Sequence, residues 1–168
     1  MDAAKRRRYQ EEFQSQGYCV VRGLFKPADV AQIASAFDRI RGPAFNSVVE
    51  ANRDEISAKL RDVWTPGGRA RANTLSPTGA NFSVVPSPTV ADPELAIAEP
   101  TPDRLSLHLI SQCGREESVL AEFGRDPRLL TLAADVLGLA EASQSEMHQI
   151  INQAHFKQPG DGVSFACA

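Results

Sequence analysis

The stretch from Thr65 to Asp103 constrains the fold more than any other part of the sequence. Seven of the eleven prolines lie in it, together with three glycines. Proline fixes the backbone φ angle and removes an N–H donor, so helices and strands are expected to be sparse here. The stretch is also far longer than ordinary connections between elements. We therefore predict that residues 65–103 form a Pro/Gly-rich loop or a partly disordered insert within a single domain, residues 1–168.

The composition is that of an ordinary globular protein. Hydrophobic residues make up 42% and charged residues 23% of the chain, which is enough for a buried core. The net charge of −3 gives no general attraction to nucleic acid or to an anionic membrane. No apolar run approaches the ~20 residues that span a bilayer. We expect a soluble, cytoplasmic protein with three reduced, structural cysteines.

The basic run at residues 5–8 is the one concentrated charge in the sequence. Glu11 and Glu12 follow it closely, which does not fit the acid-poor pattern of a transit peptide. The run is interpreted as a solvated first turn of a helix.

The N-terminal part is predicted to form a helix, a strand and a second helix. The polar segment Ala3–Gln16 reads as a helix, and the β-formers of Gly17–Phe25 favour a strand. A further helix begins at Pro27, where the missing N–H does no harm, and its apolar residues recur at helical spacing. Gly42-Pro43 is expected to end it.

The remaining patterns are shorter. Residues 45–64 are compatible with a helix that plugs Trp64 into the core. The segments after the proline-rich stretch are predicted as a strand or helix start over 104–110, a short helix over 116–123, a capped helix from Asp126 to Gly138, and a strand over 146–157 before a turn at 159–162.

No complete set of catalytic residues stands out. A non-haem iron site needs two histidines and a carboxylate on one face, and on a strand the compact form is His-x-Asp or His-x-Glu. None of His108, His148 and His155 is followed by a carboxylate two residues later. Glu146 and His148 share a strand face, but no third ligand is evident, and His155 is interpreted as structural. No metal ligand is therefore assigned.

Other chemistries also lack their motifs. The sequence contains no G-x-S-x-G nucleophile elbow, no dinucleotide fingerprint and no P-loop. From the residues alone, the chain is a globular protein without a recognisable complete active site.

Four segments in a fixed order resemble the phytanoyl-CoA dioxygenase family. The likeness runs from about Tyr9 to Phe165, with 46–103 poorly matched. Its motifs are Phe13…Gly-Tyr-Cys-Val-Val-Arg-Gly-Leu-Phe25, Phe37-Asp-Arg39, Leu130…Ala-Asp-Val-Leu-Gly138 and Phe156-Lys-Gln-Pro-Gly-Asp-Gly162. The resemblance implies an iron(II)- and 2-oxoglutarate-dependent oxygenase that hydroxylates a small molecule on a double-stranded β-helix (jelly-roll) fold.

The resemblance assigns a role to one residue. Lys157 matches the family lysine before the proline turn, which commonly helps to hold 2-oxoglutarate. In the family a Trp-His-x-Asp motif follows that turn, and a distal histidine and an arginine come later. Cys167 and Ala168 stand where the motif should begin, so the iron ligands and the arginine are absent from this sequence.

We therefore predict an α+β fold, with a helical N-terminal layer and a few strands of an incomplete jelly roll. A complete jelly roll needs about eight strands. A strand near Ile150 without a neighbour would expose backbone groups at a sheet edge, so we expect marginal stability and possible self-association.

Three functional hypotheses follow. In the first, the chain is a truncated or degenerate member of the family and is inactive. In the second, it is a non-catalytic binding or interaction protein. In the third, it is an active oxygenase whose ligands come from a second chain or from Glu146, His148 and His108. The partner that the family implies is a small-molecule substrate, with no nucleic acid and no membrane.

Overall fold

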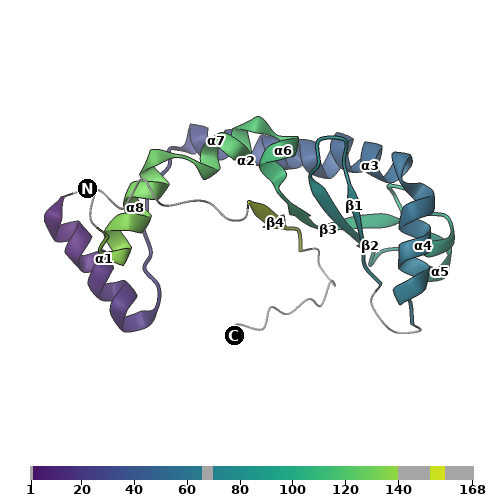
Figure 1. The fold of residues 1–168 in the computed structure, drawn as a ribbon, viewed down its shortest axis with the longest axis horizontal. Coiled ribbons are helices and arrows are strands. Elements are labelled where there is room, and N and C mark those ends of the chain that lie inside the picture. The colour runs from purple at the N-terminus through teal and green to yellow at the C-terminus, as the bar shows by residue number, and fades with distance from the viewer. Residues whose placement is uncertain (1, 66–69, 140–151, 158–168) are drawn as a thin grey trace.

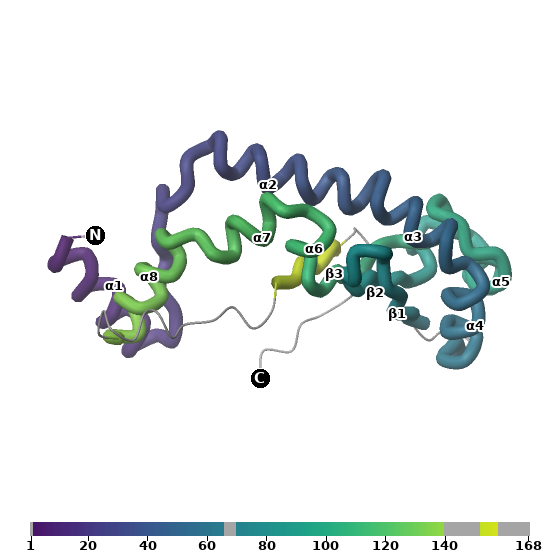
Figure 2. Tube along the Cα trace, turned by 45° about the horizontal axis from the view of Figure 1, so that its top comes forward, coloured from purple at the N-terminus to yellow at the C-terminus, as the bar shows by residue number. Residues whose placement is uncertain are grey.

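The protein folds into an elongated arch with a pair of helices at one end and a small sheet at the other (Figure 1). The computed structural model describes residues 2–65, 70–139 and 152–157. At one end α1 (Ala3–Gln16) packs on α8 (Pro127–Leu137). Between the two ends, α2 (Pro27–Arg39) and α7 (Ser118–Gly124) lie side by side, as Figure 2 shows.

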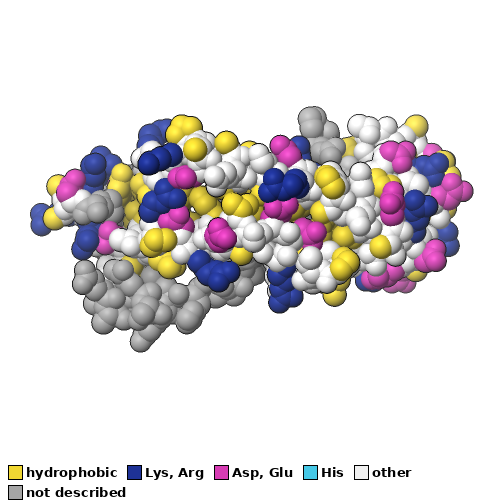
Figure 3. Space-filling model, turned by 90° about the horizontal axis from the view of Figure 1, so that it is seen from above, with side chains coloured by type: hydrophobic (Ala, Val, Ile, Leu, Met, Phe, Trp, Pro, Cys, Tyr) yellow, Lys and Arg dark blue, Asp and Glu magenta, His cyan; other side chains and the backbone are white. Residues whose placement is uncertain are grey.

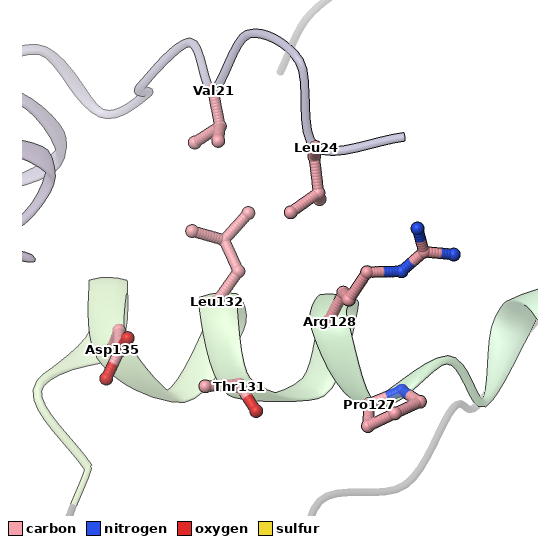
Figure 4. A pocket seen from close by; sticks show the side chains of 7 residues that line it. All are labelled: Val21, Leu24, Pro127, Arg128, Thr131, Leu132 and Asp135. Atoms are coloured by element: carbon pink, nitrogen blue, oxygen red, sulfur yellow. The ribbon is translucent and has the colours of Figure 1, made fainter. Parts of the chain in front are cut away.

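The first helix forms as its sequence predicts, but the strand after it does not. The Asp2 carboxylate accepts a hydrogen bond from the Lys5 N–H at 2.8 Å, and Gly17 ends the helix with a φ of +77°. Residues 17–26 contain no strand, which corrects the prediction for Gly17–Phe25. Two of their apolar side chains, Val21 and Leu24, point toward Leu132 of α8 and not toward a neighbouring strand (Figure 4), whereas Tyr18 and Val20 are exposed.

The helix that begins at Pro27 does not end at Gly42-Pro43. The chain continues through a π-helical turn, η1 (Ile40–Ala44), into α3 (Phe45–Ala51) and, after Asn52, into α4 (Arg53–Val63). In an α-helix the Pro43 ring would clash with the carbonyl of Arg39. The wider turn, in which the Phe45 N–H reaches the Ile40 carbonyl, removes that conflict.

The proline-rich stretch, predicted as a Pro/Gly-rich loop or a partly disordered insert over 65–103, contains two strands and one short helix among its described residues. It forms β1 (Ala72–Leu75), β2 (Asn81–Pro86) and α5 (Pro93–Ala98). Three of its prolines lie where they break no ladder: Pro77 in the turn between the strands, Pro86 at the end of β2 and Pro93 at the first position of α5.

The strands make one open antiparallel sheet in the order β1-β2-β3-β4. β3 (Leu105–Ser111) pairs with β2, and a register shift at Ser83/Val84 leaves His108 as the extra residue. β4 (Gln153–His155) pairs with β3, with His155 opposite Leu109. The prediction of a mixed helix-and-sheet fold is confirmed. The sheet that the structure shows is antiparallel, open and four-stranded.

One core joins the sheet to the helices beside it. Its fully buried side chains come from the helical path and from the two central strands, and the largest are Phe82, Ile40, Ile56, Leu60 and Ile110. Trp64 is half-buried and packs against this cluster, as predicted. Burial of such side chains contributes about 1.5–3 kcal/mol each, so this end of the arch holds most of the hydrophobic stabilisation.

The helical predictions for the second half are confirmed. The segment 104–110 is the strand β3, and α6 (Cys113–Glu116) and α7 occupy the region predicted as a short helix. Asp126 caps α8 by accepting from the Arg128 N–H at 2.8 Å, and Gly138 ends it with a φ of +70°. β4 lies within the predicted strand 146–157, whereas 146–151 and the turn at 159–162 fall outside the described residues.

The surface carries both signs of charge in close mixture. On the face seen in Figure 3, basic and acidic side chains are interspersed along the length of the molecule. Within the described residues, the structure has no helix both long enough and apolar enough to cross a membrane. The mixed surface agrees with the small net charge of −3.

Candidate functional site

A polar hollow lies where the end of β4 meets the turn between α2 and α3. It measures about 820 Å³. Its polar groups come from α2, η1, α3, β3 and the end of β4, and its apolar wall comes from two phenylalanines and three smaller residues. The polar side chains are those of Asp38, Arg41, Asn46, Ser106, His155 and Lys157; the wall is Phe45, Phe156, Pro102, Leu105 and Leu107.

The register of β4 decides which of its side chains pack against the core and which face away from it. Ala154 and Phe156 pack against the core, and the Phe156 ring meets Phe37 edge to face with centroids 5.9 Å apart. Side chains alternate along an extended chain, so His155 and Lys157 share the other face. The Phe156 N–H donates to the His108 carbonyl at 2.8 Å, which carries the pairing one residue past the strand.

Asn152 anchors the start of this strand. Its carbonyl accepts from the Cys113 N–H at 3.1 Å, its amide nitrogen donates to the Leu120 carbonyl at 3.1 Å, and the Cys113 thiol bonds to its amide oxygen. Burial raises the pKa of that thiol, so Cys113 is a structural group and not a nucleophile. These contacts of Asn152 hold the start of β4 against α6 and α7, and the position of Lys157 after β4 depends on them.

The opposite wall of the hollow comes from the π-helical turn. Arg41 lies within η1, and Phe45 and Asn46 begin α3. Sequence reasoning missed these residues because it ended the helix at Gly42-Pro43. One signal was present: Ile40 and Phe45 are both buried and stand five residues apart, a spacing that suits a π turn and not an α turn.

The charges in the hollow are unevenly paired. Arg41 makes a single 3.4 Å contact with Asp38, and the two side chains are 59% and 72% exposed. By contrast, the neighbouring Arg39 donates two hydrogen bonds of 2.7 Å to the Glu117 carboxylate, and these hydrogen bonds lower the pKa of that carboxyl. An exposed single-contact pair contributes little. Arg41 is therefore the loosely held cation of the two.

The predicted ligand residues are only partly brought together. The rings of His108 and His155 meet edge to face with centroids 6.2 Å apart. His148 and Glu146 lie outside the described residues, and within 2–65, 70–139 and 152–157 no group of three or more His, Cys, Asp or Glu side chains is placed to hold a metal ion. The described donors therefore do not make an iron site.

The same hollow does suit a small carboxylate. Lys157 and Arg41 offer cationic donors, and Asn46 and Ser106 offer neutral ones, beside aromatic walls. A site with few polar groups set against an apolar wall is the usual form of a small-molecule pocket. The Asp38 carboxylate, in contrast, works against an anion placed next to it.

A second cavity, of about 330 Å³, separates residues 21–24 from α8 (Figure 4). Val21, Leu24 and Leu132 line it, and the Arg128 guanidinium at its edge is already bound by Asp126 and Asp29. Because its one strong cation is occupied, this cavity offers weaker chemistry than the polar hollow.

Taken together, an open four-stranded antiparallel sheet flanked by helices defines a fold of the α+β class, and the hollow beside β4 gathers two cationic side chains. The sequence model of the phytanoyl-CoA dioxygenase (PhyH) family matches residues 13–166. The chain therefore belongs to the phytanoyl-CoA dioxygenase family. No curated protein and no solved structure matches it.

Proposed function

We propose that this chain is a dioxygenase-type domain that binds 2-oxoglutarate through Lys157 and, as it stands, does not turn it over. The observation that carries the proposal is the place of Lys157: the residue that matches the family lysine lines the polar hollow. The family gives the dioxygenase class, and 2-oxoglutarate with iron(II) is the cofactor pair that this class implies.

The residues of the hollow would divide the work of holding the cosubstrate. The Lys157 ammonium pairs with one carboxylate, and the Ser106 hydroxyl and the Asn46 amide are placed to donate hydrogen bonds. Phe156 shields one side of the site, since its ring packs against Phe37 and the core. A charge-assisted contact in such a partly covered site contributes about 1.5–3 kcal/mol.

The proposal of inactivity rests on the sequence. The 168 residues contain no His-x-Asp or His-x-Glu, and the described donors do not gather around a metal position. Bound iron(II) would supply oxygen activation in the family, and the described residues of this chain offer no ligand set for it.

Binding of 2-oxoglutarate tests the first half of the proposal. Isothermal titration calorimetry on the full chain is expected to detect 2-oxoglutarate, and Lys157→Gln is expected to weaken binding about tenfold. Lys5→Gln is the matched control, because it removes the same charge from the far end of the arch. An unchanged affinity in Lys157→Gln would exclude the cosubstrate role of this lysine.

Turnover tests the second half. Iron(II)-dependent decarboxylation of 2-oxoglutarate by the full chain is expected to stay at the level of the Lys157→Ala variant. Reproducible turnover above that level would show that the chain is active and that its metal ligands come from elsewhere.

We also propose that the sheet promotes self-association. β1 is an edge strand, and in the described part of the chain the three residues of β4 pair with β3 alone. Exposed strand edges favour pairing with another chain. Analytical ultracentrifugation at tens of micromolar is expected to show concentration-dependent dimers or larger species, and a strictly monomeric species would overturn this.

A further inference from the structure

The polar hollow contains two cationic side chains on different elements, and the resemblance to the family accounts for only one. Lys157 follows β4, whereas Arg41 comes from the π-helical turn η1. If Lys157 holds 2-oxoglutarate, the second cation remains to be explained.

The π turn is what brings Arg41 to the hollow. In the widened turn Arg41, Gly42, Phe45 and Asn46 all line the site, so one short segment supplies a cation, an amide and an aromatic wall. A Cβ at Gly42 would meet nothing within 4 Å, so the hollow is open beside Arg41. Single π turns inside α-helices occur frequently at functional sites.

The pairing of Arg41 leaves it available to a ligand. Its contact with Asp38 is a single one of 3.4 Å between two exposed side chains, three residues apart on the same helical path. An anionic ligand that offers Arg41 a two-pronged contact would therefore displace Asp38 at small cost. Phe45, Leu105 and Phe156 also line the hollow, so its wall is partly apolar beside Arg41.

We propose that Arg41 is a specificity-determining residue that binds the anionic group of the substrate, and that the substrate is a small acid with an apolar body. The inference rests on the proposed function, in which Lys157 binds the cosubstrate in the same hollow. The Asp38 carboxylate competes with the ligand for Arg41 and therefore disfavours weakly bound anions.

The test compares an acid with its neutral amide. For the full chain, 3-phenylpropionate is expected to bind about tenfold more tightly than 3-phenylpropanamide, as one charge-assisted contact allows. With saturating 2-oxoglutarate present to occupy Lys157, the Arg41→Gln variant is expected to bind the two probes equally. Asp38→Asn is expected to raise the affinity for the acid about twofold, because the competing charge is gone. A third probe, 2-phenylethyl phosphate, shows whether a phosphate monoester or a carboxylate is the preferred anion.

A matched arginine controls for net charge. Arg53 is exposed on α4 and does not line the hollow, so Arg53→Gln is expected to keep the preference for the acid. Since Arg41 is exposed, the fold of its variant is expected to be unchanged, and a thermal melt checks this.

The outcomes separate this inference from the proposed function. Loss of 2-oxoglutarate binding in Lys157→Gln with an unchanged acid preference, and the reverse in Arg41→Gln, supports both. Equal binding of acid and amide by the unmodified chain, no binding of either, or an acid preference that survives Arg41→Gln overturns the role of Arg41. Absence of 2-oxoglutarate binding with an intact, Arg41-dependent acid preference overturns only the cosubstrate role of Lys157.

Discussion

Arg128 and Asp29 lie 99 positions apart in the sequence and join α8 to α2, with the guanidinium Nη1 2.8 Å from the carboxylate Oδ2. The same guanidinium binds Asp126 at 2.6 Å and lies over the Phe25 ring, 4.6 Å from its centroid. Phe25 in turn packs on Phe123, with centroids 4.3 Å apart. One arginine therefore ties α8, the start of α2 and the extended segment between α1 and α2 into a single joint.

Removal of this guanidinium is expected to loosen the α1–α8 end of the arch. Arg128→Gln is predicted to lower the melting temperature by several degrees, because it breaks the ion pairs with Asp29 and Asp126 and the contact with Phe25. Differential scanning fluorimetry measures the change. Arg22→Gln is the control, since this exposed arginine lies in the same segment, and an equal loss in both variants would contradict the prediction.

Acid is expected to weaken the same joint. The hydrogen bonds from Arg128 lower the pKa of the Asp29 and Asp126 carboxyls. A carboxyl whose pKa is lowered in the folded state stabilises the fold at every pH above its pKa in the unfolded state. This stabilisation is lost as the pH falls through its pKa in the folded state. Urea unfolding should therefore be flat from pH 7 to about 5 and fall steeply below about pH 4. In Arg128→Gln the fall should be shallower, and an identical pH profile would count against the coupling.

The centre of the sheet is expected to be the least tolerant of truncation. Phe82 is fully buried on β2, so Phe82→Ala should reduce the free energy of unfolding by about 3–5 kcal/mol. Leu75 on β1 is 61% exposed, and Leu75→Ala should cost well under about 1 kcal/mol. Chemical denaturation of the two variants gives the comparison. Similar losses would mean that the sheet is not packed as described.

Two glycines are expected to respond to alanine in opposite directions. A Cβ on Gly114 would lie 2.9 Å from both the Cα and the Cβ of Ala121, so Gly114→Ala should force α6 away from α7 and cost about 1–3 kcal/mol. Gly42 has open space and a helical setting, so Gly42→Ala should be neutral or stabilise by about 0.5–1 kcal/mol. Equilibrium unfolding measures the free energy of unfolding of both variants. A destabilised Gly42→Ala would show that the π turn needs glycine.

Local signals predicted the elements that local chemistry determines. The Asp126-Pro127 start and the Gly138 end of α8 were readable, as were the Gly17 stop of α1 and the apolar stripe after Pro27. The hairpin β1–β2 was missed because prolines were counted over a whole stretch. What matters is that Pro77, Pro86 and Pro93 stand in a turn or at a boundary of an element, where no backbone donor is needed.

The failures have a common cause, which is tertiary context. Tyr18 to Phe25 have strand-forming side chains, but Val21 and Leu24 face a helix, and no sheet neighbour is provided for them among the described residues. In the site, Lys157 was found through the resemblance, whereas Arg41 and Asn46 were not. Their place in the hollow depends on a π turn, and no single residue of that turn announces it.

The π turn takes up one residue more than an α-helical turn, because the residues of Ile40–Ala44 complete about the rotation that one residue fewer completes in an α-helix. Deletion of one residue from 40–44 would therefore return the path to a regular α-helix and leave Phe45, Val48 and Val49 directed toward the core. Pro43 would then lie in an α-helical turn, where its ring clashes with the carbonyl of the residue four positions earlier. For this chain a single-codon deletion at Gly42 is therefore a local lesion at the proline, and the wall of the core that follows keeps its phase.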